Sequence, residues 1–347
     1  MPVALIAGAG GMVGRAIATR LAELGGWEII GIARNPHAVP GLRRIALDLT
    51  DAAACRRELG ALKTVTHVFY AARYDHPEGR PEPVDINAAM LENIVNALPA
   101  GGALAHVNAV HGSKYYGHQL GPVKLPMEES DPRAADANFY FVQEDFLRET
   151  ARKRGFSFTT VRPHTFCSPD ADTPRSIGLA IALYAAVQRE LGLPLDFPGS
   201  ERAFRARTQF TDLALLGRAI AWMATEPRCA NEAFNIVNGD NPSWAELWPG
   251  FAAWFGVKPG APRAFTLERY MADKQQLWDG LVRRHGLNAP RLDALVLWQY
   301  PAYVFKPEWD IISSAAKARA LGFSETVASA AMFARQFERY RAIRIIP

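Results

Sequence analysis

The chain has 347 residues, of which 39 are basic, 35 are acidic and 49% are apolar. Its length is enough for one large domain or two fused domains, and its apolar fraction is that of a globular protein. The net charge of +4 is small and no basic run is concentrated, which argues against nucleic-acid binding. No stretch reaches the ~20 apolar residues of a membrane span. We expect no signal peptide, because the apolar start lacks a basic segment and runs directly into a glycine-rich stretch. The cysteines are few and scattered, so we expect a cytoplasmic protein with reduced thiols.

The first fourteen residues contain the most informative motif. An apolar run from Val3 to Ala7 is followed directly by the glycine-rich stretch from Gly8 to Gly14 and then by apolar residues at helical spacing. Strand, glycine turn and helix in this order predict a dinucleotide site, with the phosphates at the helix N-terminus. The alternative is a glycine-rich turn that binds no ligand.

Strands and helices alternate through the first half of the chain. We expect further strands at residues 28–33, 44–47, 66–72, 104–108 and 158–161, and helices at 51–59, 85–98 and 138–154. This alternation predicts a doubly wound, Rossmann-like α/β fold with a parallel sheet, which binds ligands at the carboxyl ends of its strands.

The pattern changes after Pro163. Residues 234–237 predict one more strand that returns to the sheet, and helices are expected at 244–255 and near 266–284 and 325–342. Two of these helices carry an apolar stripe, which we expect to pack in the hydrophobic core rather than to line a ligand-binding site. We therefore expect a dinucleotide-binding domain at residues 1–165 with a returning segment at about 205–240. A smaller, mainly helical substrate-binding region would comprise residues 166–204 and 241–347, interleaved with the first.

Two polar residues follow the second and third predicted strands. Arg34 stands where an NAD-selective site has an acid for the ribose 2′-hydroxyl, and a guanidinium suits the 2′-phosphate of NADP instead. Asp48, followed by Leu49, lies where the adenine edge is expected. The alternative for Arg34 is a solvated surface arginine, and the alternative for Asp48 is an acid at a helix N-terminus.

Tyr140 and Lys114 are the candidates for hydride chemistry. Reductases with this type of sheet commonly pair a tyrosine with a lysine four residues later, but position 144 is a glutamate. Lys114 comes earlier, just after the fifth predicted strand, from where its ammonium could reach Tyr140. A nearby cation would lower the pKa of the phenol and favour hydrogen bonding to a developing oxyanion. The alternative for Lys114 is a surface loop cation.

These motifs resemble those of the progesterone 5β-reductase/iridoid synthase-like (PRISE) family, an atypical branch of the short-chain dehydrogenase/reductase superfamily. The resemblance covers nearly the whole chain and is carried by the glycine turn, by residues 112–117 around Lys114, by residues 138–145 around Tyr140, and by the terminal residues 345–347. It implies NADPH-dependent 1,4-reduction of activated C=C bonds in small-molecule enones or enals, with Tyr140 and Lys114 as catalytic residues. Whether the chain forms a homodimer stays open.

We expect the NADPH cofactor to contact the glycine turn, the strand ends and the catalytic pair, that is Gly8, Gly11, Met12, Val13, Gly14, Arg34, Asp48, Leu49, Ala71, Lys114, Tyr140, Pro163 and Thr165. Glu144 and Asp145 are interpreted as positioning or helix-terminal charges. No metal site is expected, because the histidines lack ligand spacing. Six aromatic residues could line an apolar substrate pocket or belong to the core: Tyr116, Phe166, Trp298, Tyr300, Tyr303 and Phe305.

Two other functions are compatible with parts of this pattern. A nucleotide-sugar epimerase or dehydratase would share the fold but would need a lysine at position 144. A non-catalytic NADP-binding redox sensor would keep the glycine turn and Arg34 without needing Lys114 and Tyr140.

Overall fold

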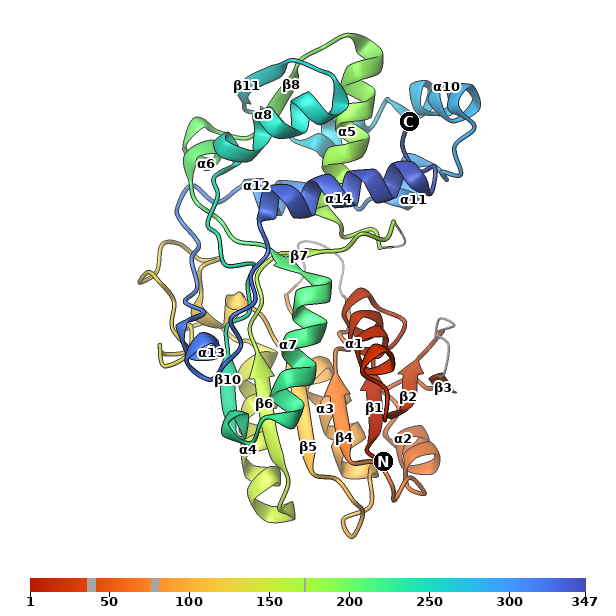
Figure 1. Cartoon of the computed structure of the whole chain (residues 1–347), viewed down its shortest axis with the longest axis vertical. Coiled ribbons are helices and arrows are strands. Elements are labelled where there is room, and N and C mark those ends of the chain that lie inside the picture. Colours follow the sequence, from red (N-terminus) through yellow and green to blue (C-terminus); the bar gives the residue numbers. More distant parts are fainter. Residues whose placement is uncertain (36–41, 76–80, 172) are drawn as a thin grey trace.

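The computed structural model of the protein describes residues 1–35, 42–75, 81–171 and 173–347. A parallel sheet of seven strands forms the lower half of the molecule in Figure 1, which confirms the predicted Rossmann-like class. In spatial order the strands are β10 (Glu232–Phe234), β6 (Ser157–Val161), β5 (His106–Val110), β4 (His67–Tyr70), β1 (Val3–Ala7), β2 (Glu28–Ala33) and β3 (Leu42–Ala46).

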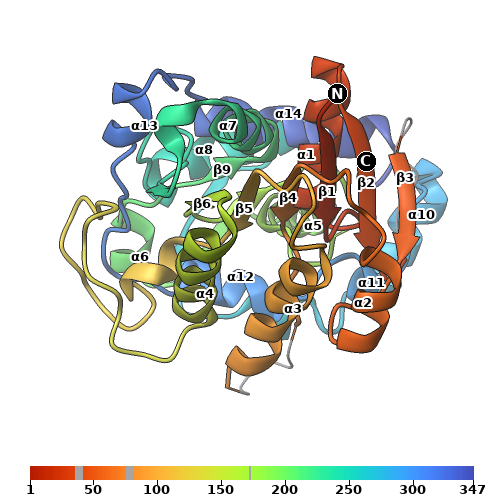
Figure 2. The same ribbon diagram turned by 90° about the horizontal axis from the view of Figure 1, so that it is seen from below.

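Helices cover both faces of this sheet, as Figure 2 shows. One face carries α1 (Met12–Leu24) and α7 (Leu213–Thr225), and the other carries α2 (Ala52–Leu59), α3 (Val84–Ala97) and α4 (Phe139–Arg154). The interior strand β1, between β4 and β2, is buried at all five positions, which explains its continuous apolar sequence. Because all the strands are parallel, their carboxyl ends lie along one edge of the sheet.

Three predicted strands are displaced from their expected positions. The third was expected at 44–47 but forms at Leu42–Ala46. The fifth was expected at 104–108 but forms at His106–Val110. The returning strand was expected at 234–237 but ends at Phe234. Asn235 leaves the sheet because its N–H donates to Glu129 and its side-chain amide donates to the carbonyls of Met127 and Ser314. The polar bonds of one asparagine therefore override the β propensity of the residues that follow it.

A second, mainly helical region occupies the upper half of Figure 1. It contains α5 (Ile177–Leu191), α6 (Glu201–Arg205), α8 (Trp244–Phe255), α9 (Leu267–Met271), α10 (Gln275–His285), α11 (Leu292–Leu295), α12 (Gln299–Phe305) and α14 (Ser329–Ala342), with a small sheet of β8 (Leu195–Pro198) and β11 (Pro259–Arg263). The predicted apolar stripes are confirmed as core: Trp248 and Phe333 are fully buried in one shared cluster. Among the described helices, none has the length and apolarity needed to cross a membrane.

Short elements join the two regions at the carboxyl edge of the sheet. A 3₁₀ turn, η1 (Ser113–Tyr116), follows β5. A two-stranded pair of β7 (Phe166–Cys167) and β9 (Thr211–Asp212) follows β6. Away from this edge, at the amino end of β10, lie η2 (Pro227–Cys229), which directly precedes the strand, and α13 (Ala316–Ala320), whose Lys317 contacts Glu232. The chain thus passes between the sheet and the helical region several times.

A buried carboxylate ties α4 to the η1 turn. Glu144, on α4, accepts a hydrogen bond of 2.9 Å from the Tyr115 hydroxyl and ion pairs with Arg133 at 3.3 Å and Arg148 at 3.0 Å. The fully buried Arg162, at the end of β6, lies 3.8 Å from the same carboxylate and stacks on the Tyr115 ring. We call these five residues the Glu144 cluster. Its bonds hold three neighbouring segments at the sheet edge in fixed positions.

Replacement of the buried carboxylate should destabilise the fold. In Glu144→Gln the buried Arg162 loses its anionic neighbour, and the breaking of a buried ion pair typically costs about 3–5 kcal/mol. The free energy of unfolding from chemical denaturation measures this loss. The matched control is Glu149→Gln, because Glu149 is exposed on the same helix and pairs with Lys153 only at the surface, where about 0.2–1 kcal/mol is expected. Equal losses in the two variants would contradict the assigned role of the cluster.

Candidate active site

A large pocket opens at the carboxyl edge of the sheet, beneath the helical region. Its volume is about 1310 Å³, more than the ~300–1,000 Å³ typical of a site for one small ligand. Every residue expected to contact the cofactor lines it, with the exception of Gly14. The structure therefore gathers residues from the glycine turn, the ends of five further strands and α4 around one space that can hold a dinucleotide and a substrate together.

The glycine turn has the shape of a phosphate cradle. Gly8 adopts φ +79°, and a Cβ there would lie 2.8 Å from the carbonyl oxygen of Ala71. Gly14 does not line the pocket but packs beneath the turn. A Cβ on Gly14 would come within 2.2 Å of the Gly8 carbonyl oxygen. Gly11, Met12 and Val13, at the N-terminus of α1, line the pocket, so the residues present fit the pyrophosphate of a dinucleotide.

The strand ends beyond this turn form a polar end of the pocket. Arg34 follows β2, and Asp48 and Leu49 follow β3; all three line the pocket. Hydrogen bonds from the backbone N–H and the hydroxyl of Thr50 hold the pKa of Asp48 below its usual range. An ionised acceptor and a guanidinium thus lie at the end of the pocket where the adenosine half of a dinucleotide is expected.

Tyr140 lies at the opposite end of the pocket, in the first turn of α4. The side chain of Asn138 caps this helix by accepting the N–H of Tyr140 at 3.0 Å. The Tyr140 ring stacks on His111 with centroids 4.7 Å apart, and its hydroxyl lies 3.1 Å from the position that a Cβ of Gly112 would occupy. The absence of a side chain at Gly112 thus leaves room for the phenol at the end of β5.

The expectation of a lowered phenol pKa is wrong for the protein without bound ligand. Burial raises the pKa of Tyr140 to about 12, and the cation that opposes this shift is Arg73 rather than Lys114. Lys114 lines the same pocket, but its ammonium lies over the ring of Tyr303, 4.8 Å from the centroid. Burial and the nearby Arg73 lower the pKa of Lys114. The phenol therefore stays protonated at neutral pH and serves as a hydrogen-bond donor.

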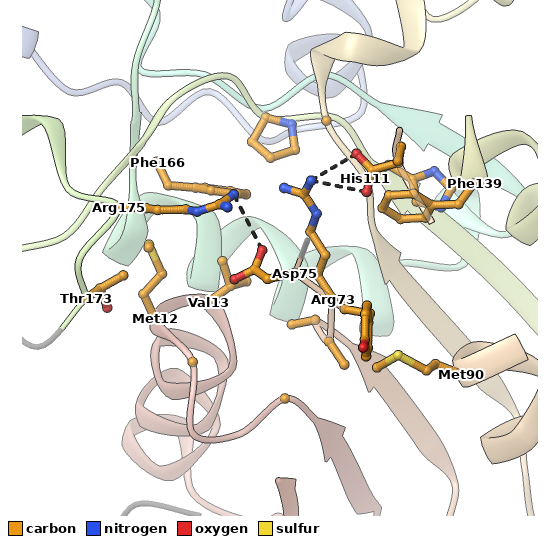
Figure 3. Close-up of a pocket in the computed structure, with 18 of the residues that line it drawn as sticks. Met12, Val13, Arg73, Asp75, Met90, His111, Phe139, Phe166, Thr173 and Arg175 are labelled. Atoms are coloured by element: carbon orange, nitrogen blue, oxygen red, sulfur yellow. Dashed lines mark hydrogen bonds and ion pairs between the residues drawn. The ribbon is translucent and has the colours of Figure 1, made fainter. Parts of the chain in front are cut away.

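Arg73 is a pocket residue that the sequence interpretation missed. It follows β4, and its guanidinium makes two contacts with the carboxylate of Glu82, at 2.9 and 3.2 Å. Figure 3 shows Arg73 extending into the pocket toward His111 and Phe139, while Arg175 enters from another wall and pairs with Asp75 at 3.4 Å. The available signal for Arg73 was a charged residue directly after the predicted strand at residues 66–72.

Part of the pocket wall is apolar. Of the six aromatic residues with two possible roles, Phe166, Tyr300 and Tyr303 line the pocket, whereas Tyr116, Trp298 and Phe305 belong to buried clusters. Pro163 and Thr165 follow β6 and also line the pocket, and Thr165 has the positive φ of +36° that non-glycine residues rarely adopt. In the described ranges, no three His, Cys, Asp or Glu side chains lie close enough to hold a metal ion.

Solved structures show the same fold. UDP-glucose 4-epimerase from Thermotoga maritima superposes with a TM-score of 0.70 at 16% identity, over 98% of this chain and 99% of that one. A short-chain dehydrogenase/reductase superfamily protein from Agrobacterium tumefaciens with bound NAD superposes with a TM-score of 0.68 at 16% identity, over 98% and 97% of the two chains. At these identities the likeness shows the fold alone.

Sequence relatives are more specific. The chain is 31% identical over 366 residues to the 3-oxo-Δ(4,5)-steroid 5β-reductase of Arabidopsis thaliana, and 30% identical over 370 residues to an (S)-8-oxocitronellyl enol synthase of Camptotheca acuminata. Both alignments cover 99% of this chain and 93% of the relative. The sequence profile of the PRISE-like Rossmann-fold domain matches residues 48–347. The chain therefore belongs to the PRISE-like family of Rossmann-fold proteins.

Proposed function

We propose that the protein is an NADPH-dependent reductase of activated C=C bonds in enones or enals. The observation that carries this proposal is the placement of Tyr140: the half-buried side chain packs its hydroxyl against Gly112 at a strand end, in the same pocket as the glycine cradle and Lys114. The names of two relatives support the substrate class, because one is a reductase of a 3-oxo-Δ(4,5)-steroid and the other an enol synthase.

The residues that would hold the cofactor divide along the pocket. The cradle around Gly8 and Gly11 would bind the pyrophosphate, and Arg34 would bind the 2′-phosphate of NADPH. The neighbouring Asp48 and Leu49 would contact the adenosine. Met12, Val13, Ala71, Pro163 and Thr165 would line the path toward the nicotinamide, which when bound supplies a hydride.

The chain's own contribution to the chemistry is electrostatic. Addition of a hydride at the β-carbon of an enone places negative charge on the carbonyl oxygen. The Tyr140 hydroxyl, kept protonated by burial, would donate a hydrogen bond to this oxygen, and Lys114 and Arg73 would add positive potential. One such preorganised donor is typically worth about 3–4 kcal/mol in the transition state.

The epimerase alternative is weaker, although epimerases share the fold. Position 144 would have to be a lysine beside the tyrosine, yet Glu144 points into the Glu144 cluster and pairs there with three arginines. A non-catalytic redox sensor would need neither Tyr140 nor Lys114 in the pocket wall.

Removal of the Arg34 guanidinium should weaken NADPH binding selectively. Charge-assisted hydrogen bonds are worth about 1.5–3 kcal/mol, so Arg34→Ala should raise the Kd for NADPH by about 10- to 100-fold while changing the Kd for NADH little. Isothermal titration calorimetry with both dinucleotides measures this difference. The matched control is Arg44→Ala, an exposed arginine on the adjacent strand β3. A similar loss for both dinucleotides would show that Arg34 does not read the 2′-phosphate.

Loss of the phenol should abolish most of the reduction. Tyr140→Phe should lower turnover by ~10²-fold or more, because one oxyanion donor is removed, while NADPH still binds. The assay follows the nicotinamide absorbance of NADPH with a panel of cyclic enones and enals, and calorimetry checks binding. The matched control, Tyr74→Phe, removes another hydroxyl from the same pocket.

Two results would overturn this proposal. Turnover of Tyr140→Phe at the level of the unmodified protein would remove Tyr140 from the mechanism. Binding of NADPH without its oxidation by any member of the panel would favour the redox sensor.

A further inference from the structure

The pocket wall contains two histidines that share one serine hydroxyl. The Ser113 Oγ lies 3.0 Å from Nε2 of His118 and 2.6 Å from Nδ1 of His164. The two imidazole rings meet edge to face with centroids 5.0 Å apart. All three side chains are nearly or fully buried, with His164 the most exposed at 9%. We call them the His–Ser–His chain; nothing in the reductase chemistry described above uses them.

The His–Ser–His chain lies beside the two proposed catalytic residues, Tyr140 and Lys114. Ser113 directly precedes Lys114, and His164 directly follows Pro163. A Cβ on Gly112 would lie 3.1 Å from the Tyr140 hydroxyl and 3.6 Å from the Pro163 carbonyl oxygen, so these segments touch at one point. Ser113, His118 and His164 line the same pocket as Tyr140 and Lys114.

The histidines also line a second, smaller cavity. This cavity has a volume of about 30 Å³, which is room for one water molecule, and both His118 and His164 contribute to its wall. The two imidazoles therefore separate the large pocket from a space that solvent can occupy.

Hydrogen-bonding capacity fixes the direction of the bonds in this chain. Burial lowers the pKa of both imidazoles, so each ring is neutral and carries one N–H and one acceptor nitrogen. Nδ1 of His118 is buried without a partner among the described residues. A buried unpaired donor is rarer than a buried unpaired acceptor, so the His118 proton belongs on Nε2, directed at Ser113.

The remaining directions follow from this assignment. Ser113 accepts from His118 and donates its own hydrogen to Nδ1 of His164, which suits the short separation of 2.6 Å. His164 then carries its proton on Nε2, which has no partner in the described part of the chain, on a ring that lines the pocket.

We propose that His164 is the proton donor that completes the reduction, delivering its Nε2 hydrogen to the α-carbon of the substrate enolate. This inference rests on the proposed function, because a 1,4-reduction needs one proton at the α-carbon in addition to the hydride. Ser113 and His118 are positioning residues that keep the proton of His164 on Nε2.

The enolate electron pair forms the new C–H bond as the Nε2–H bond of His164 breaks. As Nε2 gives up its hydrogen, Nδ1 of His164 takes the Ser113 hydroxyl proton, and the Ser113 oxygen keeps the hydrogen bond from His118. Nε2 then takes a proton from water in the pocket and Nδ1 returns its proton to Ser113, which restores the starting tautomer. The net change is the uptake of one solvent proton, and the α-carbon is protonated from one face only.

The product of an α-substituted enone records that face. With 2-methylcyclohex-2-enone and NADPH, the unmodified protein should give the two enantiomers of 2-methylcyclohexanone in a ratio of about 10:1 or more, measured by chiral chromatography on early quenched samples. His164→Phe keeps a ring but no proton donor, and its product ratio should fall to about 1:1. The matched control is His106→Phe, because His106 is also a buried imidazole bonded to two hydroxyls, at the far end of β5.

The outcomes separate this inference from the proposed function. Oxidation of NADPH by the enone with a 1:1 product ratio in the unmodified protein, or a ratio that His164→Phe leaves unchanged, would overturn the role of His164 while the reductase stands. Failure of every enone and enal in the panel, α-substituted or not, to oxidise NADPH would overturn both.

A second measurement needs neither substrate nor variant. Two-bond ¹H–¹⁵N spectra of the unliganded protein at neutral pH report which ring nitrogen carries each proton. His118 and His164 should both be Nε2–H tautomers. A His164 ring protonated on Nδ1 would leave Nε2 without a hydrogen to give and would overturn the proposal.

Discussion

The contact between the first turn of α1 and the Gly8 carbonyl determines the rest of the site. No side chain fits between them, since a Cβ at Gly14 would lie 2.2 Å from that oxygen. The close approach brings the N-terminus of α1 to the carboxyl end of β1, which pairs with β2 on one side and β4 on the other. Because the other strands are parallel to β1, their ends and the loops after them open onto the same edge, and α4 and η1 complete the wall opposite the glycine turn.

Burial affects the polar groups at this edge in two ways: it is compensated by ion pairs in the Glu144 cluster, and it shifts pKa values in the pocket. In the Glu144 cluster, charges of both signs compensate one another, and the cluster fixes η1 and α4 relative to each other. In the pocket, burial keeps Tyr140 protonated and lowers the pKa of Lys114, with Arg73 acting on both groups. A preorganised donor in a weakly solvated pocket acts more strongly on a developing charge than the same donor in water. The rigid cluster behind the pocket thus supports the donor in front of it.

The features that local sequence encodes were predictable. The glycine turn, the strand–helix alternation and the apolar stripes of α8 and α14 depend on residues a few positions apart, and the structure bears them out. The ends of β5 and β10 were not, because bonds to distant residues such as Glu129 set them. Arg73 and the His–Ser–His chain were missed for the same reason: their partners lie on other segments, and the ammonium of Lys114 is placed by Tyr303, which is 189 positions away.

The several crossings between the sheet and the helical region restrict how this architecture can be recombined. The sheet receives its last strand, β10, and its covering helix, α7, from residues that lie between α6 and α8 of the helical region. A chimaera that takes its substrate-binding helices from another member of the family therefore cannot be made with a single junction. Each added junction would have to preserve the pairing of β7 with β9 and of β6 with β10, so exchange of whole blocks is far more demanding than the replacement of individual lining side chains.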